Sequence, residues 1–198
     1  HATAQTRPLA EEVELDMDQR PLTPETFFKS PGYWRPDPLR EALEGRGKRV
    51  AKPALAASNA QIAATEERLG IRLPEGLRAL YRVMDGGYVG ALYVPLKRVP
   101  GPVYDDWRGA FSIDYSSLSP LKNLRTVRAH YEDFTHDPAD MPAHADTLLV
   151  LQARYGDMTL LDYSRPGEPQ VSIVDFDRNG ALTDITFETF DAFFRALR

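Results

Sequence analysis

The stretch IRLPEGLRALYRVMDGGYVG, residues 71–90, contains an amphipathic helix that stops abruptly at two glycines. Pro74 suits the first helical turn, where its missing N–H would have no partner anyway, and Glu75 complements the positive helix N-terminus. Apolar residues recur at helical spacing and form one stripe: Leu73, Leu77, Leu80, Tyr81 and Met84. Asp85-Gly86-Gly87 then permits a left-handed cap and a chain reversal. The pattern predicts a helix followed by a strand over residues 88–96.

A second helix is expected immediately before this one. Ser58 and Gln61 have the spacing of a capping box, in which each side chain bonds to the backbone N–H of the other. Ile62, Leu69 and the alanines between them provide an apolar face, and Gly70 closes the helix. The sequence therefore predicts a pair of short helices ending in the double glycine.

The region beyond residue 95 changes from loops to strands. Four prolines make residues 95–120 loop-rich, and residues 121–134 have a helical pattern. Three short apolar strands follow, separated by turns, and then a fourth strand; they are TLLVLQ (147–152), MTLLDY (158–163), VSIVDF (171–176) and LTDIT (182–186). Thr186 is expected to cap a closing helix with an apolar stripe of Phe187, Phe190, Phe194 and Leu197.

These elements predict an α+β fold: an antiparallel, mainly meandering sheet with helices packed on one side. The strands follow one another too closely for the crossovers of a parallel sheet. The expected core includes Leu73, Leu80, Tyr81, Phe190 and Phe194. We divide the chain into an N-terminal extension, residues 1–57, and a main domain, residues 58–198. In the extension, alternating apolar residues at 13–17 suit an edge strand or an ordered arm, and short helices are expected near residues 23 and 38.

Composition limits the function classes. The chain has 198 residues, no cysteine and a net charge of −5. The charge argues against a general nucleic-acid binder, the absence of cysteine excludes disulfides and thiolate chemistry, and no apolar run is long enough to span a bilayer. We expect a cytoplasmic protein; a periplasmic location after removal of a signal peptide is the alternative, and His1 is a candidate tag remnant.

The charges are unevenly distributed. Residues 130–198 contain thirteen acids against five arginines and no lysine, a net charge of −8. Such a region is a candidate surface for a basic partner, and the alternative is that the acids only promote solubility.

No enzyme signature is present. His130, His136 and His144 lie among acids, but their spacing matches neither HExxH nor a zinc finger, so we expect no metal there. The chain also lacks GxSxG, GxxxxGK[ST] and GxGxxG. We therefore expect no catalytic residues and no cofactor; a metal-dependent or hydrolytic enzyme built on the histidine segment is a distant alternative.

Residues 58–90 resemble the amino-terminal signature of the SMI1/KNR4 family, also called the SUKH superfamily. The matching features are a helix ending in Leu69-Gly70, the turn at residues 71–75 with its Leu-Pro-Glu, a second helix, and Asp85-Gly86-Gly87. The segments GDMTLLDYS, VSIVDFDRNG and TFETFDAFFRAL are similar to the family's closing hairpins and last helix. The family usually has Asn or Asp before the two glycines, and both residues tolerate the turn.

The resemblance implies protein binding rather than catalysis. Bacterial members are mostly immunity proteins that neutralise the toxins of polymorphic, contact-dependent or type VI systems, whereas fungal members regulate cell-wall assembly. The expected function is thus neutralisation of a cognate toxin, and the alternative is a non-catalytic scaffold or regulatory module. The resemblance supplies no shared catalytic set of residues.

The candidate functional residues fall into two groups. The partner-binding candidates are acids and aromatics in the acidic region and in the loop before it: Tyr104, Asp105, Asp106, Trp107, Asp162 and Asp177. The fold-determining candidates belong to the opening stretch: Leu73, Pro74, Asp85, Gly86 and Gly87. The expected partner is a protein toxin, for which a basic, nuclease-like toxin is one candidate. We expect no nucleic-acid binding, no membrane insertion and a monomer or weak dimer.

Overall fold

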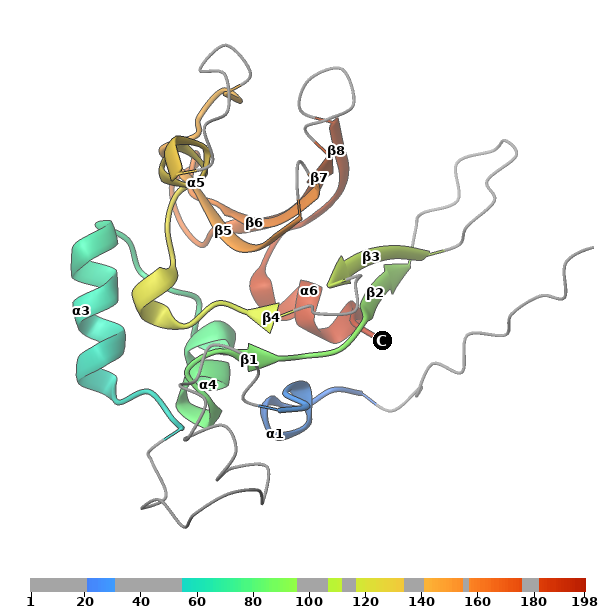
Figure 1. Ribbon diagram of the computed structural model, residues 1–198. Coiled ribbons are helices and arrows are strands. Elements are labelled where there is room, and N and C mark those ends of the chain that lie inside the picture. Colours follow the sequence, from blue (N-terminus) through green and yellow to red (C-terminus); the bar gives the residue numbers. More distant parts are fainter. Residues whose placement is uncertain are drawn as a thin grey trace, which may run out of the picture.

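The computed structural model shows helices packed around three antiparallel sheets (Figure 1). It describes residues 21–30, 55–95, 107–111, 117–133, 141–154, 157–175 and 182–198. The expected strand at residues 13–17 and the expected helix near residue 38 lie outside the described residues. The short helix expected near residue 23 is α1 (Pro24–Phe27).

The two short helices predicted before the double glycine both form, and the first of them has the predicted caps at both ends. Helix α3 (Asn59–Leu69) begins at a capping box, in which Ser58 N donates to Gln61 Oε1 at 2.8 Å and Gln61 N donates to Ser58 Oγ at 3.2 Å. Gly70, at φ 65°, ends the helix in the left-handed conformation that glycine tolerates best. Helix α4 (Glu75–Val83) follows, with Pro74 as its N-cap residue. Its C-cap residue is Met84 in an extended conformation, so the expected left-handed cap is wrong; the left-handed residue, Gly86, lies two positions further on.

The apolar face expected on α3 is narrower than predicted. Ile62 and Thr65 are its buried residues, and Leu69 is half-buried. The helical alanines are exposed instead: Ala60, Ala63 and Ala64. Alanine has so little apolar surface that its exposure costs little, so spacing alone did not reveal which side would pack.

The apolar stripe of α4 forms the centre of the larger core. Leu73, Leu80 and Tyr81 are each at most 1% exposed, and Phe190 is 2% exposed. The core prediction is confirmed for these four residues, whereas Phe194 is half-buried against the same cluster.

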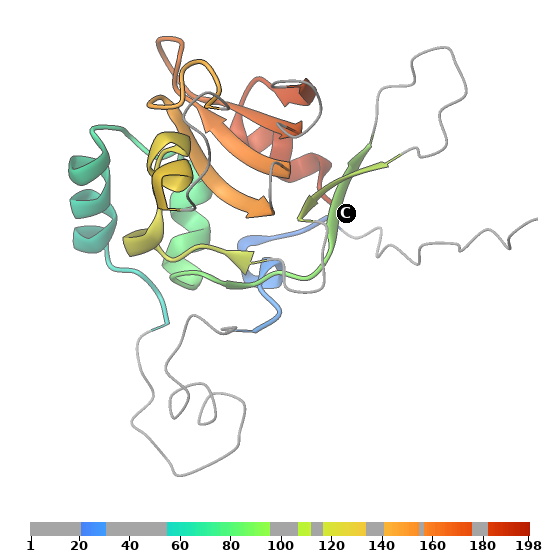
Figure 2. The ribbon, with the colours of Figure 1, turned by 45° about the horizontal axis from the view of Figure 1, so that its top comes forward.

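A four-stranded sheet follows the chain order. It contains β5 (Leu148–Arg154), β6 (Asp157–Asp162), β7 (Gln170–Asp175) and β8 (Leu182–Phe187), each antiparallel to the next. The α+β class and the antiparallel meander are therefore confirmed. Figure 2 shows α3 and the β2–β3 ribbon on opposite sides of the molecule, with this sheet between them.

Both faces of the sheet carry buried apolar residues. One face, with Leu149, Leu161 and Ile173, belongs to the core cluster that α4 and α6 (Phe190–Ala196) complete. The other face packs against α5 (Val127–Asp133) through a second cluster that includes Val150 and Leu160. The sequence predicted helices on one side of the sheet. The structure has helices on that side, and α5 also covers part of the opposite side. The adjacent apolar residues in β5 (Leu148–Leu151) and in β6 (Leu160 and Leu161) reflect this double burial, because neighbouring residues of a strand point to opposite faces.

The region expected to be loop-rich contains two short ribbons. In one, β1 (Gly87–Tyr88) pairs with β4 (Ser117–Leu118); in the other, β2 (Leu92–Pro95) pairs with β3 (Trp107–Phe111). The single strand expected over residues 88–96 is thus divided between β1 and β2. Gly90, at φ 74°, lies between them and allows the chain to turn from one ribbon to the other.

The helix expected over residues 121–134 is interrupted. A short 3₁₀ helix, η2 (Leu121–Asn123), is separated from α5 by residues 124–126, where Val150 N donates to Arg125 O at 3.0 Å. Thr126 also forms a β-bridge with Leu149. Pairing with the edge of β5 therefore prevails over continued helix in this segment.

The start of the last helix was also placed too early. Thr186 lies inside β8, and Thr189 caps α6 instead, with Ala192 N donating to Thr189 Oγ1 at 3.1 Å. The alternation of side chains between the two faces of β8 continues to Phe187. The strand therefore includes Thr186 and Phe187, which the sequence pattern had placed at the start of the helix.

Candidate functional site

The helix stop at residues 85–87 joins several segments that are distant in sequence. Asp85 Oδ1 accepts a hydrogen bond from Leu121 N at 2.8 Å, and Asp85 N donates to Leu55 O at 2.6 Å. The carboxylate thus satisfies an N–H at the start of η2 that has no partner within that helix.

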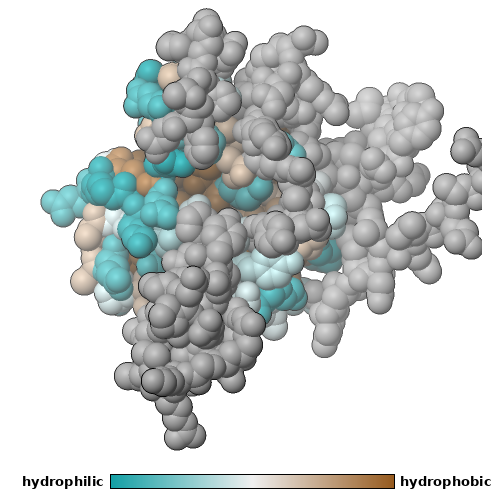
Figure 3. All heavy atoms as spheres, in the orientation of Figure 1, coloured by the Kyte–Doolittle hydropathy of each residue, from teal (hydrophilic) through white to brown (hydrophobic). Residues whose placement is uncertain are grey.

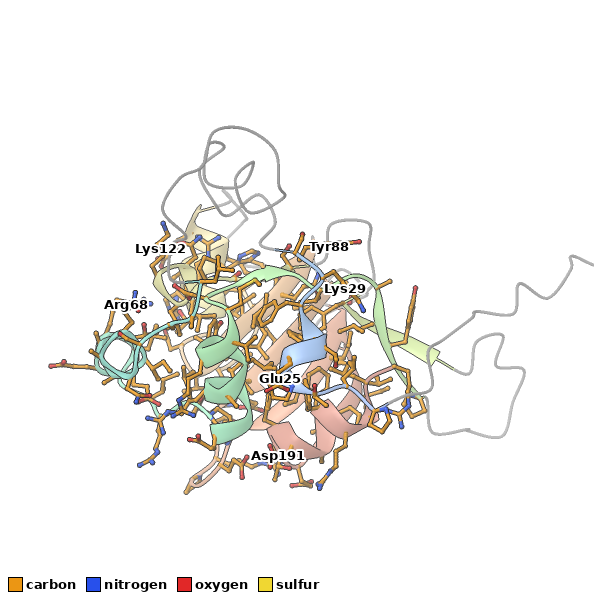
Figure 4. All side chains as sticks on the ribbon, turned by 90° about the horizontal axis from the view of Figure 1, so that it is seen from below. Glu25, Lys29, Arg68, Tyr88, Lys122 and Asp191 are labelled. Atoms are coloured by element: carbon orange, nitrogen blue, oxygen red, sulfur yellow. The ribbon has the colours of Figure 1, made fainter. Side chains whose placement is uncertain are left out.

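The two glycines lie where the backbones approach most closely. A Cβ at Gly86, which has φ 79°, would stand 2.6 Å from Pro120 N. A Cβ at Gly87 would stand 2.7 Å from Ser30 O. Tyr88 N also donates to Ser30 O at 2.8 Å, and Figure 4 shows Tyr88 beside Lys29 at this junction. We infer that Asp85, Gly86 and Gly87 act in folding, by bringing α1, α4 and η2 together.

Polar side chains around this junction bind backbone carbonyls. Tyr81 Oη donates to Ser119 O at 2.8 Å, and burial raises the pKa of Tyr81 well above its usual range, with a smaller contribution from Asp85. Arg68, on α3, donates to Leu121 O and Leu124 O at 2.9 and 3.1 Å. Arg68 and Lys122 lie on the same side of the molecule in Figure 4. These bonds hold η2 against α3 and α4.

A second polar junction lies where α3 meets α4. Glu66 Oε1 accepts from Leu73 N at 2.8 Å and lies 3.5 Å from Arg78 Nε. Tyr163, from the β6–β7 hairpin, donates to Arg72 O at 2.9 Å. Burial, and secondarily the nearby Glu66, raises the pKa of Tyr163. The Leu-Pro-Glu turn is thereby tied to the four-stranded sheet, with both Leu73 and Pro74 buried.

The histidines are described in part. His130, on α5, is half-buried with its ring near Tyr131, and His144 is exposed at φ 62°; His136 lies outside the described residues. Within the described part of the chain, no group of three His, Cys, Asp or Glu side chains is placed to hold a metal ion.

The partner-binding candidates are also described in part. Tyr104, Asp105, Asp106 and Asp177 lie outside the described residues. Trp107 is the first residue of β3, opposite Pro95. Asp162 ends β6, where its Oδ1 accepts from Ser164 N at 2.8 Å and begins the turn into the hairpin. Trp107 and Asp162 belong to different sheets, so they are not register neighbours.

Several acids of the carboxy-terminal region have structural partners. Asp146 pairs with Arg128 on α5, and this contact lowers the pKa of the exposed Asp146 carboxyl. Glu188, which is exposed, accepts from Gln170 Nε2 at 2.8 Å. Both acids remain at the surface, so the acidic region keeps charge that is accessible to a partner.

The outer edge of β8, the last strand of the meander, is not among the candidate sites predicted from the sequence. In a sheet whose strands follow chain order, the first and last strands are the edges. The predicted strand order was therefore enough to indicate that β8 is an edge strand. Figure 3 shows hydrophilic and moderately hydrophobic residues side by side over α3, and strongly hydrophobic residues near β5 and β6. Among the described residues, no helix has both the length and the hydrophobicity needed to span a membrane.

The chain was compared with known proteins. A comparison with curated proteins finds no significant match. The model of the SMI1/KNR4 family (SUKH-1) matches residues 56–196, which include α3, the helix stop, the four-stranded sheet and α6. This match extends over well beyond half of the chain, so the protein belongs to the SMI1/KNR4 family.

Proposed function

We propose that this protein is an immunity protein that neutralises a bacterial toxin by stoichiometric protein–protein binding. The observation that carries the proposal is the family match over residues 56–196. The family resemblance implies binding to a protein partner, and for bacterial members that partner is mostly a toxin.

The hydrogen bonds that the polar side chains near the helix stop make to the backbone support a binding role rather than a catalytic one. Tyr81, Asp85 and Arg68 each bind a backbone group of η2 or the residues beside it. A general acid, base or nucleophile must instead be positioned toward a substrate. We therefore propose that the protein acts without catalysis and without a cofactor.

We further propose that the toxin-binding surface combines the acidic region with residues 104–107. The region from residue 130 has a net charge of −8. A toxin that cleaves nucleic acid needs a basic active site, and an acidic inhibitor would imitate its phosphate substrate. Tyr104 and Trp107 would supply aromatic anchors, which interfaces favour at their centres.

Co-expression with the product of the adjacent gene tests the proposal. The expected result is a complex that purifies in equal proportions and cells that survive the toxin only when this protein is present. A toxin of unrelated sequence serves as the control and should be neither bound nor neutralised. Unchanged toxicity together with no complex would contradict the proposal and favour the regulatory module.

A further inference from the structure

The four-stranded sheet has one edge that a described segment covers and one edge beside which the described residues place no strand or helix. At β5 the outer side is occupied by residues 125–126, through the Val150 N to Arg125 O bond and the Thr126–Leu149 bridge. At β8 the described residues provide no such neighbour, and Figure 1 shows β8 at the sheet margin with no described helix or strand along its outer side. Every second residue of an antiparallel edge strand turns its N–H and C=O outward.

The β8 edge has a defined regular stretch. The register against β7 shifts between Ile173 and Val174, after which Ile185, Thr186 and Phe187 pair in order with Ile173, Ser172 and Val171. The bulge precedes this stretch and leaves it regular up to the turn into α6. A further strand could therefore add to the sheet in a fixed register.

The side chains along this edge differ on its two faces. Ile185 and Phe187 are half-buried against the main core cluster, and the Phe187 ring lies 5.6 Å from that of Phe193. On the other face, Thr186 and Glu188 are exposed. An added strand would thus meet an apolar border on one face and a polar, acidic border on the other.

We propose that the β8 edge receives an extended segment of the protein partner in which apolar and basic residues alternate. The backbone would pair as in β-strand addition, the apolar residues would lie beside Ile185 and Phe187, and the basic residues would face Glu188. This inference rests on the proposed binding function and names the element that performs it.

Charge disfavours a second copy of this chain as the occupant. A second copy would bring the region from residue 130, with its net charge of −8, against an identical region, and like charges repel. A basic segment is attracted by the same charge.

Amide hydrogen exchange tests the proposal without the toxin. The probe is a ten-residue peptide of alternating valine and lysine, and the controls are a valine–glutamate peptide and a valine–lysine peptide N-methylated at every second residue. We expect only the first peptide to slow exchange, and only at those amides of residues 185–187 whose N–H points outward. Glu188→Lys should weaken its binding by about two- to five-fold. Glu67→Lys, the same charge change on exposed α3, should leave it unchanged.

Three results would overturn the proposal. They are no slowing in β8 at millimolar peptide, equal slowing by the valine–glutamate peptide, and protection that grows with protein concentration when no peptide is present. The last result would assign the edge to a second copy. If the toxin is bound while β8 amides exchange at their free rate, the proposed function stands and this inference fails.

Discussion

Gly86 packs so closely against Pro120 that a larger residue fits only if the backbone shifts. Replacing it with alanine combines a strained left-handed backbone with a close contact to Pro120 N. We expect Gly86→Ala to lower the free energy of unfolding by about 2–5 kcal/mol, from about 1–2 for the backbone and about 1–3 for overpacking. Gly70 is the matched control, because it also has positive φ but nothing within 4 Å of a Cβ. Gly70→Ala should cost only about 1–2 kcal/mol in urea denaturation. Equal losses would contradict the packing explanation.

Asp85 stabilises the fold as a hydrogen-bond acceptor. Asn keeps an acceptor oxygen for Leu121 N, whereas Ala leaves that N–H without its partner. We expect Asp85→Asn to change the free energy of unfolding by about 0.5 kcal/mol or less, and Asp85→Ala to lower it by about 1–2 kcal/mol. Equal effects of the two substitutions in chemical denaturation would refute this role.

Because of Tyr81, we expect the free energy of unfolding to decrease at alkaline pH. Its folded pKa lies well above the usual value of about 10, so the unfolded chain loses this proton first as the pH rises. The stability from the neutral phenol is fully present below pH 10 and is lost as the pH rises toward the folded pKa. Tyr81→Phe should cost about 1 kcal/mol at pH 7, with the loss of the bond to Ser119 O, and should make unfolding less pH-dependent above pH 10. Denaturation curves at pH 7 and pH 11 provide the measurement; an unchanged pH dependence would count against it.

Local sequence patterns predicted the structural role of these residues, but they did not predict which residues these would contact. The double glycine indicated a helix stop, because only local backbone chemistry was needed. That Asp85 binds Leu121 N and that Gly86 meets Pro120 could not be predicted, since those contacts join residues more than thirty positions apart.

In helix α6 the predicted stripe is correct at Phe190 and Leu197, which are buried, and one position too late at Phe194. The sequence indicated Phe194, yet Phe193 is the more deeply buried, at 1% exposure. We expect Phe193→Ala to lower the free energy of unfolding by about 3–5 kcal/mol and Phe194→Ala by roughly 1–2 kcal/mol. Thermal denaturation with a chemical-denaturant check compares the two, and a larger loss for Phe194→Ala would contradict the described packing.

Strand positions were predictable where apolar runs are long and unreliable where they are short. β5, β6 and β7 were located because each is rich in apolar residues and lies between turn residues. β3 and β4 were missed because they have five and two residues, and their pairing depends on long-range neighbours. The break between η2 and α5 has the same origin, since it depends on pairing with β5.

The charge of the whole protein leads to a prediction about association. If the acidic region and residues 104–107 bind a basic toxin, the association rate should fall as salt rises, because screening weakens the long-range attraction. Asp105→Ala and Asp106→Ala should reduce the salt dependence, and Trp107→Ala should weaken binding by about 2 kcal/mol or more. Stopped-flow association across ionic strength provides the measurement. Binding that is independent of salt and unchanged in all three variants would exclude this surface.

The family was identifiable from the sequence, but the toxin was not. The helix stop and the closing strands and helix are dictated by the shared fold, whereas the surface that selects a partner depends on that partner. Four of the six partner-binding candidates lie outside the described residues, so their role stays a prediction.

A titration of toxin activity tests the central claim, neutralisation by stoichiometric binding, most directly. Increasing amounts of this protein are added to a fixed amount of the adjacent gene's product, and its remaining activity is measured. Stoichiometric binding predicts a linear decrease that reaches zero at a fixed ratio near one to one and does not deepen with time. Inactivation of excess toxin by a small fraction of this protein, progressing with time, would show turnover and contradict the claim, as would full toxin activity at every ratio.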